Sequence, residues 1–458
     1  MFGAGSNRNP NGSSEFPVHP VGRLVLPGHA GATLDAKEKP MRTALWIVLA
    51  LNVAGSLSAE EDWRQFRGST GEGHTRANHL PLTWNENHKV VWKTAIHDRG
   101  WSSPVICGNQ IWMTAATGDG HRLFAACVDR ETGKIVHDLH VFSVERPQPI
   151  AAENTYATPT PAIEPGRVYV HYGTYGTACL NSATGSIVWT RRDLNCDHET
   201  GAGPCSSPFL LGNLLIVNVD GRDVQYMIAL DTSSGKTVWK TDRSFDYATV
   251  PVNKRKAFSM PLLVPRGAGR QLVSTGGQAV YAYDPVTGKE LWKVRHHGFS
   301  AVPRPVYGHG LVFLVTDYDR PELWAVRVDG SGDVTDSHVA WKETRGIPSR
   351  SSPLLVDDLL YVISHQGILS CLEAKTGEFV WKNRLEGRYS ASAIHAGNRI
   401  YLFNENAVCT VIRPGRKFEE LAVNRLNGQS VMASPAVAGD SFFIRTEKHL
   451  YRVEETTK

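Results

Sequence analysis

The sequence predicts an all-β chain that folds as an eight-bladed β-propeller of four-stranded antiparallel blades. A small or apolar residue meets Pro or Ala just before a short apolar strand, and the eight such junctions begin at Ser103, Thr158, Ser207, Met260, Val302, Ser352, Ser392 and Ser434. Between most junctions runs a second pattern, Asp-x-x-Thr-Gly-Lys-x-x-Trp. An internal period of roughly 40–50 residues built from short strands is typical of propellers.

The unit at 206–241 shows how the first half of a blade is expected to form. Pro208 begins the first strand, a position where a missing backbone N–H costs little. Gly212-Asn213 then supplies a hairpin turn that tolerates positive φ. The second strand, at 214–217, is a continuous apolar run of the kind that is buried on both faces.

A tight turn joins the third strand of this unit, at 226–230, to the fourth. The Asp231 side chain can accept backbone N–H groups in the turn, and Gly235 takes the left-handed position. Trp239 follows four residues after the glycine, on the outer strand. We predict that tryptophans in this slot wedge between adjacent blades, where an indole buries about 150–250 Å². A repeated structural slot explains them better than a ligand-stacking box does.

The last unit indicates how the ring closes. It begins at Pro435, and the chain beyond that point is long enough for about three strands. The missing fourth strand is expected at 89–93, which has the outer-strand pattern with Trp92 although no blade precedes it. An N-terminal strand that completes the last blade leaves no open sheet edge. This arrangement favours eight blades over seven.

Residues 1–59 are expected to lie outside the propeller, which we assign to 60–458. Residues 1–40 are rich in Gly, Pro, Asn and Ser, which predicts a disordered extension or a mis-assigned start before Met41. Residues 41–59 have a basic start, a short apolar run and small residues at the end, the pattern of a cleaved signal peptide rather than of a buried core helix. The run is too short to span a bilayer. We therefore expect a periplasmic or secreted protein without a transmembrane anchor.

Charge and cysteine content narrow the functional classes. The net charge is only +4 and no long run has one sign, so nucleic acid is not an expected partner. We expect a monomer. Four of the seven cysteines fall in small, buried strand slots of the repeat, namely Cys127, Cys179, Cys371 and Cys409. Cys196 and Cys205 instead lie in an irregular segment between blades, where a disulfide is a plausible pairing in an oxidising compartment.

The repeated units resemble the pyrroloquinoline-quinone (PQQ) repeats of quinoprotein dehydrogenases and of BamB-type and related non-enzymatic propellers. The resemblance covers residues 62–458. The stretches DWRQFRG (62–68), YATPTP (156–161) and NCDHE (195–199) are similar to secreted PQQ-like repeat proteins of planctomycete-type bacteria. The resemblance implies a propeller outside the cytoplasm and does not choose a reaction.

The family resemblance raises the question of catalysis. A quinoprotein dehydrogenase binds PQQ on the propeller axis, and a Ca²⁺ ion held by oxygen ligands polarises the quinone. Many such enzymes also carry two adjacent cysteines, which this sequence lacks, and no single loop shows a recognisable set of Ca²⁺ ligands. We therefore predict a non-catalytic scaffold that binds a protein or a ligand. A PQQ-dependent oxidoreductase with an atypical site and a carbohydrate- or peptide-binding propeller remain alternatives.

The first group of candidate ligand-binding residues lies near the strand junctions. It contains the basic residues Lys254, Arg255, Lys256, Arg304, Arg350 and Arg388 and the aromatic residues Trp101 and Tyr156. If these positions rim one mouth of the central channel, that mouth is electropositive and attracts a small anionic ligand or an acidic protein tail. The aromatic side chains offer contact surface to an envelope or secreted protein. The alternative is a set of solvated basic loops.

The second group of candidates lies in the segment between two blades. Asp197, His198 and Glu199 follow Cys196, and His171 lies upstream. Such side chains can bind a divalent metal or act as acid and base. The alternative is a solvated polar loop, because consecutive residues rarely all point at one ion. The identity of any metal is left open.

Overall fold

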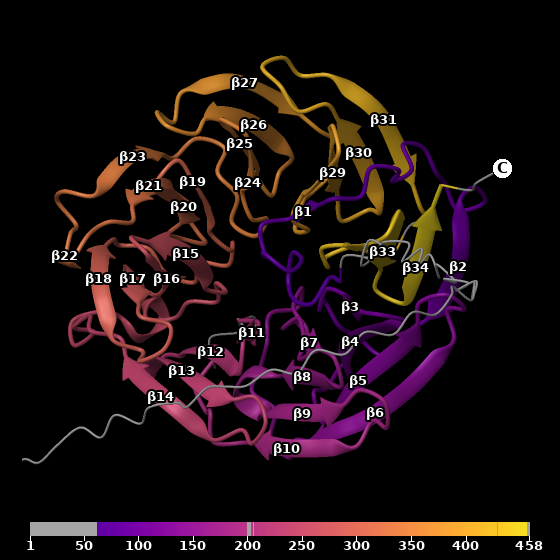
Figure 1. The fold of residues 1–458 in the computed structure, drawn as a ribbon, viewed down its shortest axis with the longest axis horizontal. Helices are drawn as coiled ribbons and strands as arrows, with labels where there is room; N and C mark the ends of the chain where they lie inside the picture. The colour runs from indigo at the N-terminus through magenta and orange to yellow at the C-terminus, as the bar shows by residue number, and fades with distance from the viewer. Residues whose placement is uncertain (1–61, 199–202, 205, 428, 456–458) are drawn as a thin grey trace, which may run out of the picture. The chain divides into compact units, whose positions relative to one another are not determined.

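The computed structural model describes residues 62–455 except 199–202, 205 and 428. These residues form eight four-stranded antiparallel blades arranged in a ring (Figure 1), which confirms the predicted fold class. The predicted extension at 1–40 and signal peptide at 41–59 lie outside the described residues. Two short 3₁₀ helices, η1 (Gly173–Tyr175) and η2 (Val252–Lys254), interrupt the strands. No helix within the described part is long and apolar enough to cross a membrane.

Each of the first four blades follows the chain from the axis outward. Blade 1 contains β3 (Val105–Cys107), β4 (Gln110–Ala116), β5 (Arg122–Asp129) and β6 (Ile135–Ser143). Blade 2 contains β7 (Ala162–Glu164), β8 (Arg167–His171), β9 (Thr177–Asn181) and β10 (Ile187–Arg191). Blade 3 contains β11 (Phe209–Leu211), β12 (Leu214–Asp220), β13 (Gln225–Asp231) and β14 (Thr237–Asp242). Blade 4 contains β15 (Leu262–Arg266), β16 (Gly269–Thr275), β17 (Ala279–Tyr283) and β18 (Glu290–Arg295), with the short β22 (Gly332–Asp333) added in parallel.

The remaining blades repeat this order. Blade 5 contains β19 (Val306–Gly308), β20 (Leu311–Val315), β21 (Leu323–Arg327) and β23 (Val339–Glu343). Blade 6 contains β24 (Leu354–Val356), β25 (Leu359–Ile363), β26 (Ile368–Glu373) and β27 (Phe379–Arg384). Blade 7 contains β28 (Ile394–Ala396), β29 (Arg399–Phe403), β30 (Val408–Ile412) and β31 (Glu420–Arg425). Blade 8 contains β32 (Ala436–Ala438), β33 (Ser441–Arg445) and β34 (His449–Glu454) from the C-terminal end, and β2 (Val90–Ala95) from the N-terminal end.

The pairing of β2 with β34 closes the ring, as the sequence predicts. The two strands run antiparallel, with Trp92 opposite Arg452. The Trp92 indole N–H donates to the Arg130 carbonyl of blade 1 at 3.0 Å, so this tryptophan also joins the eighth blade to the first. The outer strand of the last blade therefore comes from the N-terminal part of the propeller. The ring cannot open here without breaking both the β2–β34 pairing and the hydrogen bond from Trp92 to Arg130.

Tryptophans in the repeated slot wedge between blades, which confirms the second prediction. Trp189 of blade 2 is buried, and its indole N–H donates to the Thr232 carbonyl of blade 3 at 2.9 Å. A Cβ on Gly235 would lie 2.7 Å from Trp189 Cδ2, and Gly235 also has a φ of +69°. The glycine of this turn is thus needed twice, for the left-handed backbone and for the indole of the preceding blade.

Hydroxyl groups at the junctions link neighbouring blades around the axis. The Ser103 N–H donates to Thr160 Oγ1 at 2.9 Å, and the Thr160 N–H donates to Ser207 Oγ at 2.9 Å. On the other side of the ring, the Ser352 N–H donates to Ser392 Oγ at 3.0 Å. The recurrence of Ser and Thr at the junctions therefore reflects a blade-to-blade hydrogen-bond chain.

Two of the eight predicted junctions lie two residues too early. The first strand of blade 2 begins at Ala162 and that of blade 5 begins at Val306. The residues that occupy the junction slot are therefore Thr160, before Pro161, and Arg304, before Pro305, rather than Thr158 and Val302. Both segments contain two X-Pro pairs, and the inter-blade hydrogen bonds decide which pair meets the strand.

The N-terminal segment Asp62–Thr75, called the strap below, crosses the ring (Figure 1). It begins at blade 1, where the Trp63 N–H donates to the Ile106 carbonyl at 3.0 Å, and it ends in β1 (His74–Thr75), which pairs in parallel with β28 of blade 7. Between these points the Arg67 guanidinium donates to the Pro353 carbonyl of blade 6 at 2.9 Å. Because these blades surround the axis, the strap closes one end of the central channel.

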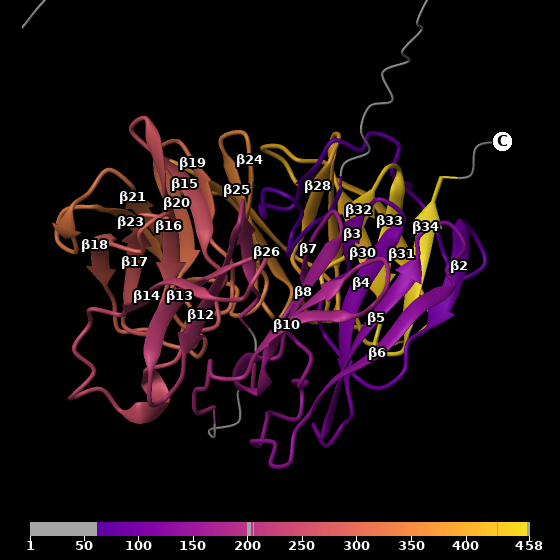
Figure 2. The ribbon, with the colours of Figure 1, turned by 60° about the horizontal axis from the view of Figure 1, so that its bottom comes forward.

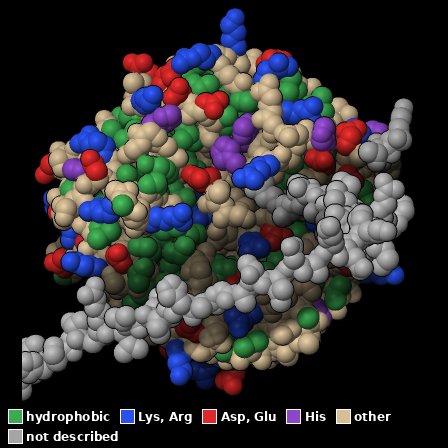
Figure 3. Space-filling model, viewed as in Figure 1, with side chains coloured by type: hydrophobic (Ala, Val, Ile, Leu, Met, Phe, Trp, Pro, Cys, Tyr) green, Lys and Arg blue, Asp and Glu red, His purple; other side chains and the backbone are tan. Residues whose placement is uncertain are grey.

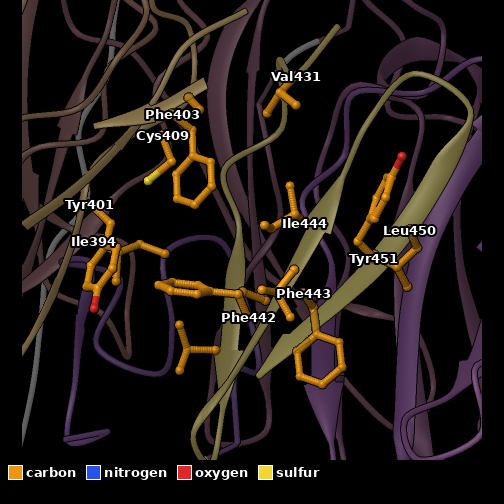
Figure 4. Packing of buried hydrophobic residues seen from close by; sticks show 14 of the residues in the cluster. Ile394, Tyr401, Phe403, Cys409, Val431, Phe442, Phe443, Ile444, Leu450 and Tyr451 are labelled. Carbon is orange, nitrogen blue, oxygen red and sulfur yellow. The ribbon is translucent and has the colours of Figure 1, made fainter. Parts of the chain in front are cut away.

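The core lies between the blades as a series of apolar clusters. Figure 4 shows one of them, in which Phe442 of β33 points toward Tyr401 and Phe403 of blade 7. The Phe442 and Tyr401 rings pack edge to face with centroids 4.8 Å apart. Such ring contacts stabilise the interface beyond the apolar area they bury.

Connections of unequal length distinguish the two faces of the ring. The longest ones follow β6, β10 and β14, at 144–161, 192–208 and 243–261. Figure 2 shows the described parts of these connections below the ring, whereas the indigo strap lies above it. On the visible part of the strap-bearing face, acidic and basic side chains are interspersed (Figure 3).

Candidate functional site

A cavity of about 430 Å³ lies on the propeller axis, on the side opposite the strap. Its lining comes from the connections that precede the first strand of all eight blades, which places it at the centre of the ring. The aromatic and sulfur-containing part of the lining consists of Phe66, Trp101, Phe258, Met260, Phe299, Tyr318 and Met432. Phe66 belongs to the strap, so the strap forms the floor of the cavity.

An ion pair spans the mouth of this cavity. Arg350, in the connection before blade 6, places its NH2 group 3.0 Å from Glu153 Oε1, in the connection before blade 2. Blades 2 and 6 face each other across the eight-membered ring. The Trp101 indole N–H donates to the Glu153 carbonyl at 3.0 Å, which fixes the position of the acidic residue. A second cavity of about 290 Å³ shares Trp101, Glu153 and Arg350 with the first, so the ion pair lies where the two cavities meet.

The inner side of Arg350 is held by a polar network. Its Nε and NH2 groups donate to the Tyr318 hydroxyl at 3.1 and 2.8 Å. Its NH1 group lies 3.6 Å from Glu405, which also accepts a 2.5 Å hydrogen bond from Ser390 Oγ and lies 3.1 Å from His365 Nε2. Burial, followed by the charge of Arg350, lowers the pKa of His365. The mouth therefore offers a fixed cation, two carboxylates and a neutral imidazole.

Four of the predicted ligand-binding residues line these cavities. Trp101, Lys256 and Arg350 line the axial cavity, and Trp101, Arg350 and Arg388 line the second one. They come from different connections, and the ring brings them to one mouth. Lys256 is buried, whereas Arg388 is exposed.

The other predicted residues near the junctions lie elsewhere. Tyr156 is buried between blades 1 and 2, and its hydroxyl donates to the Gln148 carbonyl at 2.8 Å. Arg304 is fully buried beneath the strap, because it occupies the junction slot of blade 5. Lys254 is exposed, with its Nζ 5.6 Å from the centre of the Phe299 ring. Arg255 donates from Nε to the Val250 carbonyl at 2.9 Å.

The histidines of the second predicted group are buried. His171 Nδ1 lies 2.8 Å from Thr177 Oγ1, and burial lowers the pKa of His171 to about 3. His198 Nε2 lies 3.1 Å from Cys196 Sγ, and burial followed by the charge of Lys256 lowers its pKa to about 4. The cavity beside the two histidines measures about 20 Å³, which is room for about one water molecule.

The acidic residues of this group do not join the histidines. Asp197 pairs with Arg222, with Oδ2 3.2 Å from NH1, and its side chain is 35% exposed. Glu199 and Cys205 lie outside the described residues. The metal site and the Cys196–Cys205 disulfide therefore stay predictions.

Comparison with known proteins identifies the family. The family model described as outer membrane protein assembly factor BamB matches residues 125–262 and 255–458. The chain belongs to the BamB family. A BamB from Shewanella oneidensis is 21% identical over 320 residues, which cover 66% of this chain and 75% of that protein.

Solved structures share the fold with this BamB-family chain at low identity. The crystal structure of BamB from Moraxella catarrhalis has a TM-score of 0.55 at 13% identity and covers 81% of this chain and 98% of that one. The quinohemoprotein alcohol dehydrogenase from Comamonas testosteroni has a TM-score of 0.59 at 10% identity and covers 87% of this chain and 82% of that one. Proteins with different functions therefore share this ring, and the function of this chain has to be inferred from its site and not from its fold.

The described residues of the axial cavity in this BamB-family propeller suit the PQQ anion but not the Ca²⁺ ion that accompanies it. Trp101 and the cations Lys256 and Arg350 suit a planar anion. A Ca²⁺ ion needs about six to eight oxygen ligands. The carboxylates at the mouth lie against Arg350, and no group of three or more His, Cys, Asp or Glu side chains in the described part of the chain is placed to hold a metal. The described residues therefore do not fit a Ca²⁺-assisted quinone site.

Several residues of the mouth were not predicted from the sequence. Tyr318, His365 and Glu405 all follow the second strand of their blades, in blades 5, 6 and 7. Because all three residues occupy the same position of the repeat unit, a comparison of the units with one another points to them. Glu153 lies in a long connection without repeat counterparts, and no local pattern points to it.

Proposed function

We propose that this chain is a non-catalytic binding scaffold of the cell envelope that receives a segment of a partner protein in the mouth of the axial cavity. The supporting observation is the axial cavity of about 430 Å³, which strap residue Phe66 lines at its floor. Its volume falls in the range of ligand pockets, about 300–1,000 Å³. Membership of a family described as an outer membrane protein assembly factor agrees with a protein partner.

The chemistry of the cavity favours a short peptide segment as the occupant. Trp101, Phe258 and Phe299 offer aromatic surface for apolar side chains, and aromatic residues are enriched where proteins bind one another. The Glu153–Arg350 pair at the mouth presents one acceptor and one donor group to a polar backbone. A segment of a few residues can use both, with its side chains in the cavity and its backbone at the rim.

The same proposal places the protein outside the cytoplasm. The pattern at 41–59 supports export through a cleaved signal peptide, and the family description supports an envelope location. The mature chain then works in the periplasm or as a secreted protein.

Photo-crosslinking in the cells that produce the protein tests the proposal. A benzoylphenylalanine in place of Phe299, at the cavity, should give one discrete protein adduct on illumination. The same group in place of Val286, which is 71% exposed on the turn between β17 and β18, is the control and should give none. Equal adducts at both positions, or none at either, would contradict a partner at the mouth.

Two other functions have specific support and separate outcomes. The position of the cavity on the axis supports a PQQ-dependent oxidoreductase with an atypical site, and saturable PQQ binding by the purified protein would favour it. The aromatic lining supports a carbohydrate-binding propeller, and retention on immobilised glycans, lost on Trp101→Ala, would favour that function.

A further inference from the structure

Two arginine side chains are buried at the strap. Arg67, on the strap itself, and Arg304, at the junction of blade 5, are both fully buried, with relative exposures of 1% and 0%. Arg67 NH2 donates to the Pro353 carbonyl at 2.9 Å, and Arg304 NH1 donates to the Phe66 carbonyl at 2.9 Å. Among the described residues, each guanidinium therefore has one hydrogen bond, to a backbone carbonyl.

The remaining donors of both groups have no partner among the described residues. These are Nε and NH1 of Arg67 and Nε and NH2 of Arg304. A guanidinium carries five N–H donors and stays charged in proteins. Burial of such a group costs several kcal/mol unless its charge and its donors are matched. The charge of Arg304 acts on the buried Arg67, so the two guanidiniums repel each other and need a compensating group.

The charges near the two arginines do not balance. Glu72 is the acidic residue that acts on both, and its Oε1 accepts a 3.2 Å hydrogen bond from the Tyr307 N–H. Burial, followed by the charge of Arg304, lowers the pKa of Arg67 to about 9, so both guanidiniums remain protonated at neutral pH. Within the described part of the chain, two positive charges thus lie near one negative charge, which leaves one positive charge to be neutralised.

The strap backbone is shaped around these groups. A Cβ on Gly71 would lie 1.6 Å from Arg304 NH1, and a Cβ on Gly73 would lie 2.7 Å from Arg67 NH2. Arg67 itself has a φ of +64°, a left-handed conformation that non-glycine residues rarely adopt. Strained backbone persists where the surrounding structure over-determines it, which is common at binding sites.

We propose that Arg67 and Arg304 together hold one small monovalent inorganic anion of the chloride class, which locks the strap across the axis. The anion accepts from the free N–H groups of both side chains and supplies the missing negative charge. Because Phe66 forms the cavity floor and its carbonyl accepts from Arg304, the anion also fixes the closed end of the cavity. This inference does not depend on what the cavity binds.

Thermal unfolding of the purified protein tests the site with chloride as the probe. At constant ionic strength, replacing sodium gluconate with sodium chloride should raise the melting temperature by a few degrees and then saturate, as expected for a ligand of the folded state. Arg304→Met should remove this dependence. Arg445→Met is the matched control, because Arg445 is equally buried but bonds Ser102, and it should lower stability while keeping the chloride response.

Bromide diffraction provides a test that does not need a folded variant. Crystals of the wild-type protein grown with sodium bromide should show an anomalous peak within hydrogen-bonding distance of both Arg67 and Arg304. A melting temperature independent of chloride, or density at this position that is explained by water without an anomalous signal, would overturn the proposal.

Discussion

Substitution of Gly235 by Ala should weaken the interface between blades 2 and 3 far more than its single methyl group suggests. The residue has a φ of +69°, and a left-handed L-residue costs about 1–2 kcal/mol. The new Cβ would also lie 2.7 Å from Trp189 Cδ2, and overpacking of this kind costs about 1–3 kcal/mol. We expect a combined loss of about 2–5 kcal/mol, measured as the shift in the midpoint of urea unfolding by circular dichroism.

Gly212 of the same blade is the matched control. Its φ is +54°, but a Cβ there would meet no atom within 4 Å, so Gly212→Ala should cost only the backbone strain of about 1–2 kcal/mol. In a Trp189→Ala background, Gly235→Ala should fall to the same cost, which corresponds to a coupling energy of about 1–3 kcal/mol. Equal costs for the two glycines in the wild-type background would refute the reasoning.

Three further predictions follow from the described contacts. Burial lowers the pKa of His171 and of His296 to about 3, against about 6.5 in the unfolded chain, so the folded state binds fewer protons. The free energy of unfolding should keep the full contribution of these neutral histidines above pH 6.5 and should fall on acidification, by about 2 kcal/mol per histidine at pH 5. A melting temperature that is unchanged between pH 7 and pH 5 would contradict this. Trp92→Ala should weaken the joining of blade 8 to blade 1 and lower the free energy of unfolding by somewhat less than the ~3–5 kcal/mol of a fully buried indole. The N-terminal segment should then be cleaved faster by a protease, and an unchanged rate of cleavage would argue against this role of Trp92. Arg350→Met should raise the pKa of His365 because a nearby positive charge is removed, which an NMR titration measures, and an unchanged or lower pKa would show that burial alone sets it.

Local repetition explains why the sequence predicted the ring so well. The turn glycines and the tryptophans recur at fixed spacing, so each copy supports the interpretation of the others. The closing strand could be predicted because β2 carries the outer-strand pattern without a blade of its own. The same reasoning placed two junctions wrongly, since 158–161 and 302–305 each contain two X-Pro pairs and only contacts between blades distinguish them.

The strap could not be predicted, because nothing in it repeats. Arg67 bonds a carbonyl 286 positions along the chain, and the phenylalanine beside it reaches the cavity floor. In the sequence, the stretch at 62–68 is distinguished only by its resemblance to related proteins. A segment that contacts many blades once each leaves no periodic signal.

The candidate site was predicted in part. Trp101 and Tyr156 both precede junctions, yet only Trp101 reaches the cavity, because the long connection before blade 2 turns Tyr156 toward Gln148. Arg304 and Arg350 also look equivalent in the sequence. Arg304 lies one residue before its strand-opening Pro305, in the buried junction slot, whereas Arg350 lies farther from its strand and reaches the mouth.

Hydrogen–deuterium exchange of the full-length protein, with and without the partner captured by crosslinking, tests most directly whether the mouth of the axial cavity is the binding surface. Binding should slow exchange in the connections at 296–305 and 344–353, which carry Phe299 and Arg350, and leave the outer strand β14 unchanged. Slower exchange confined to the outer strands or to the strap, with the mouth unaffected, would contradict the account.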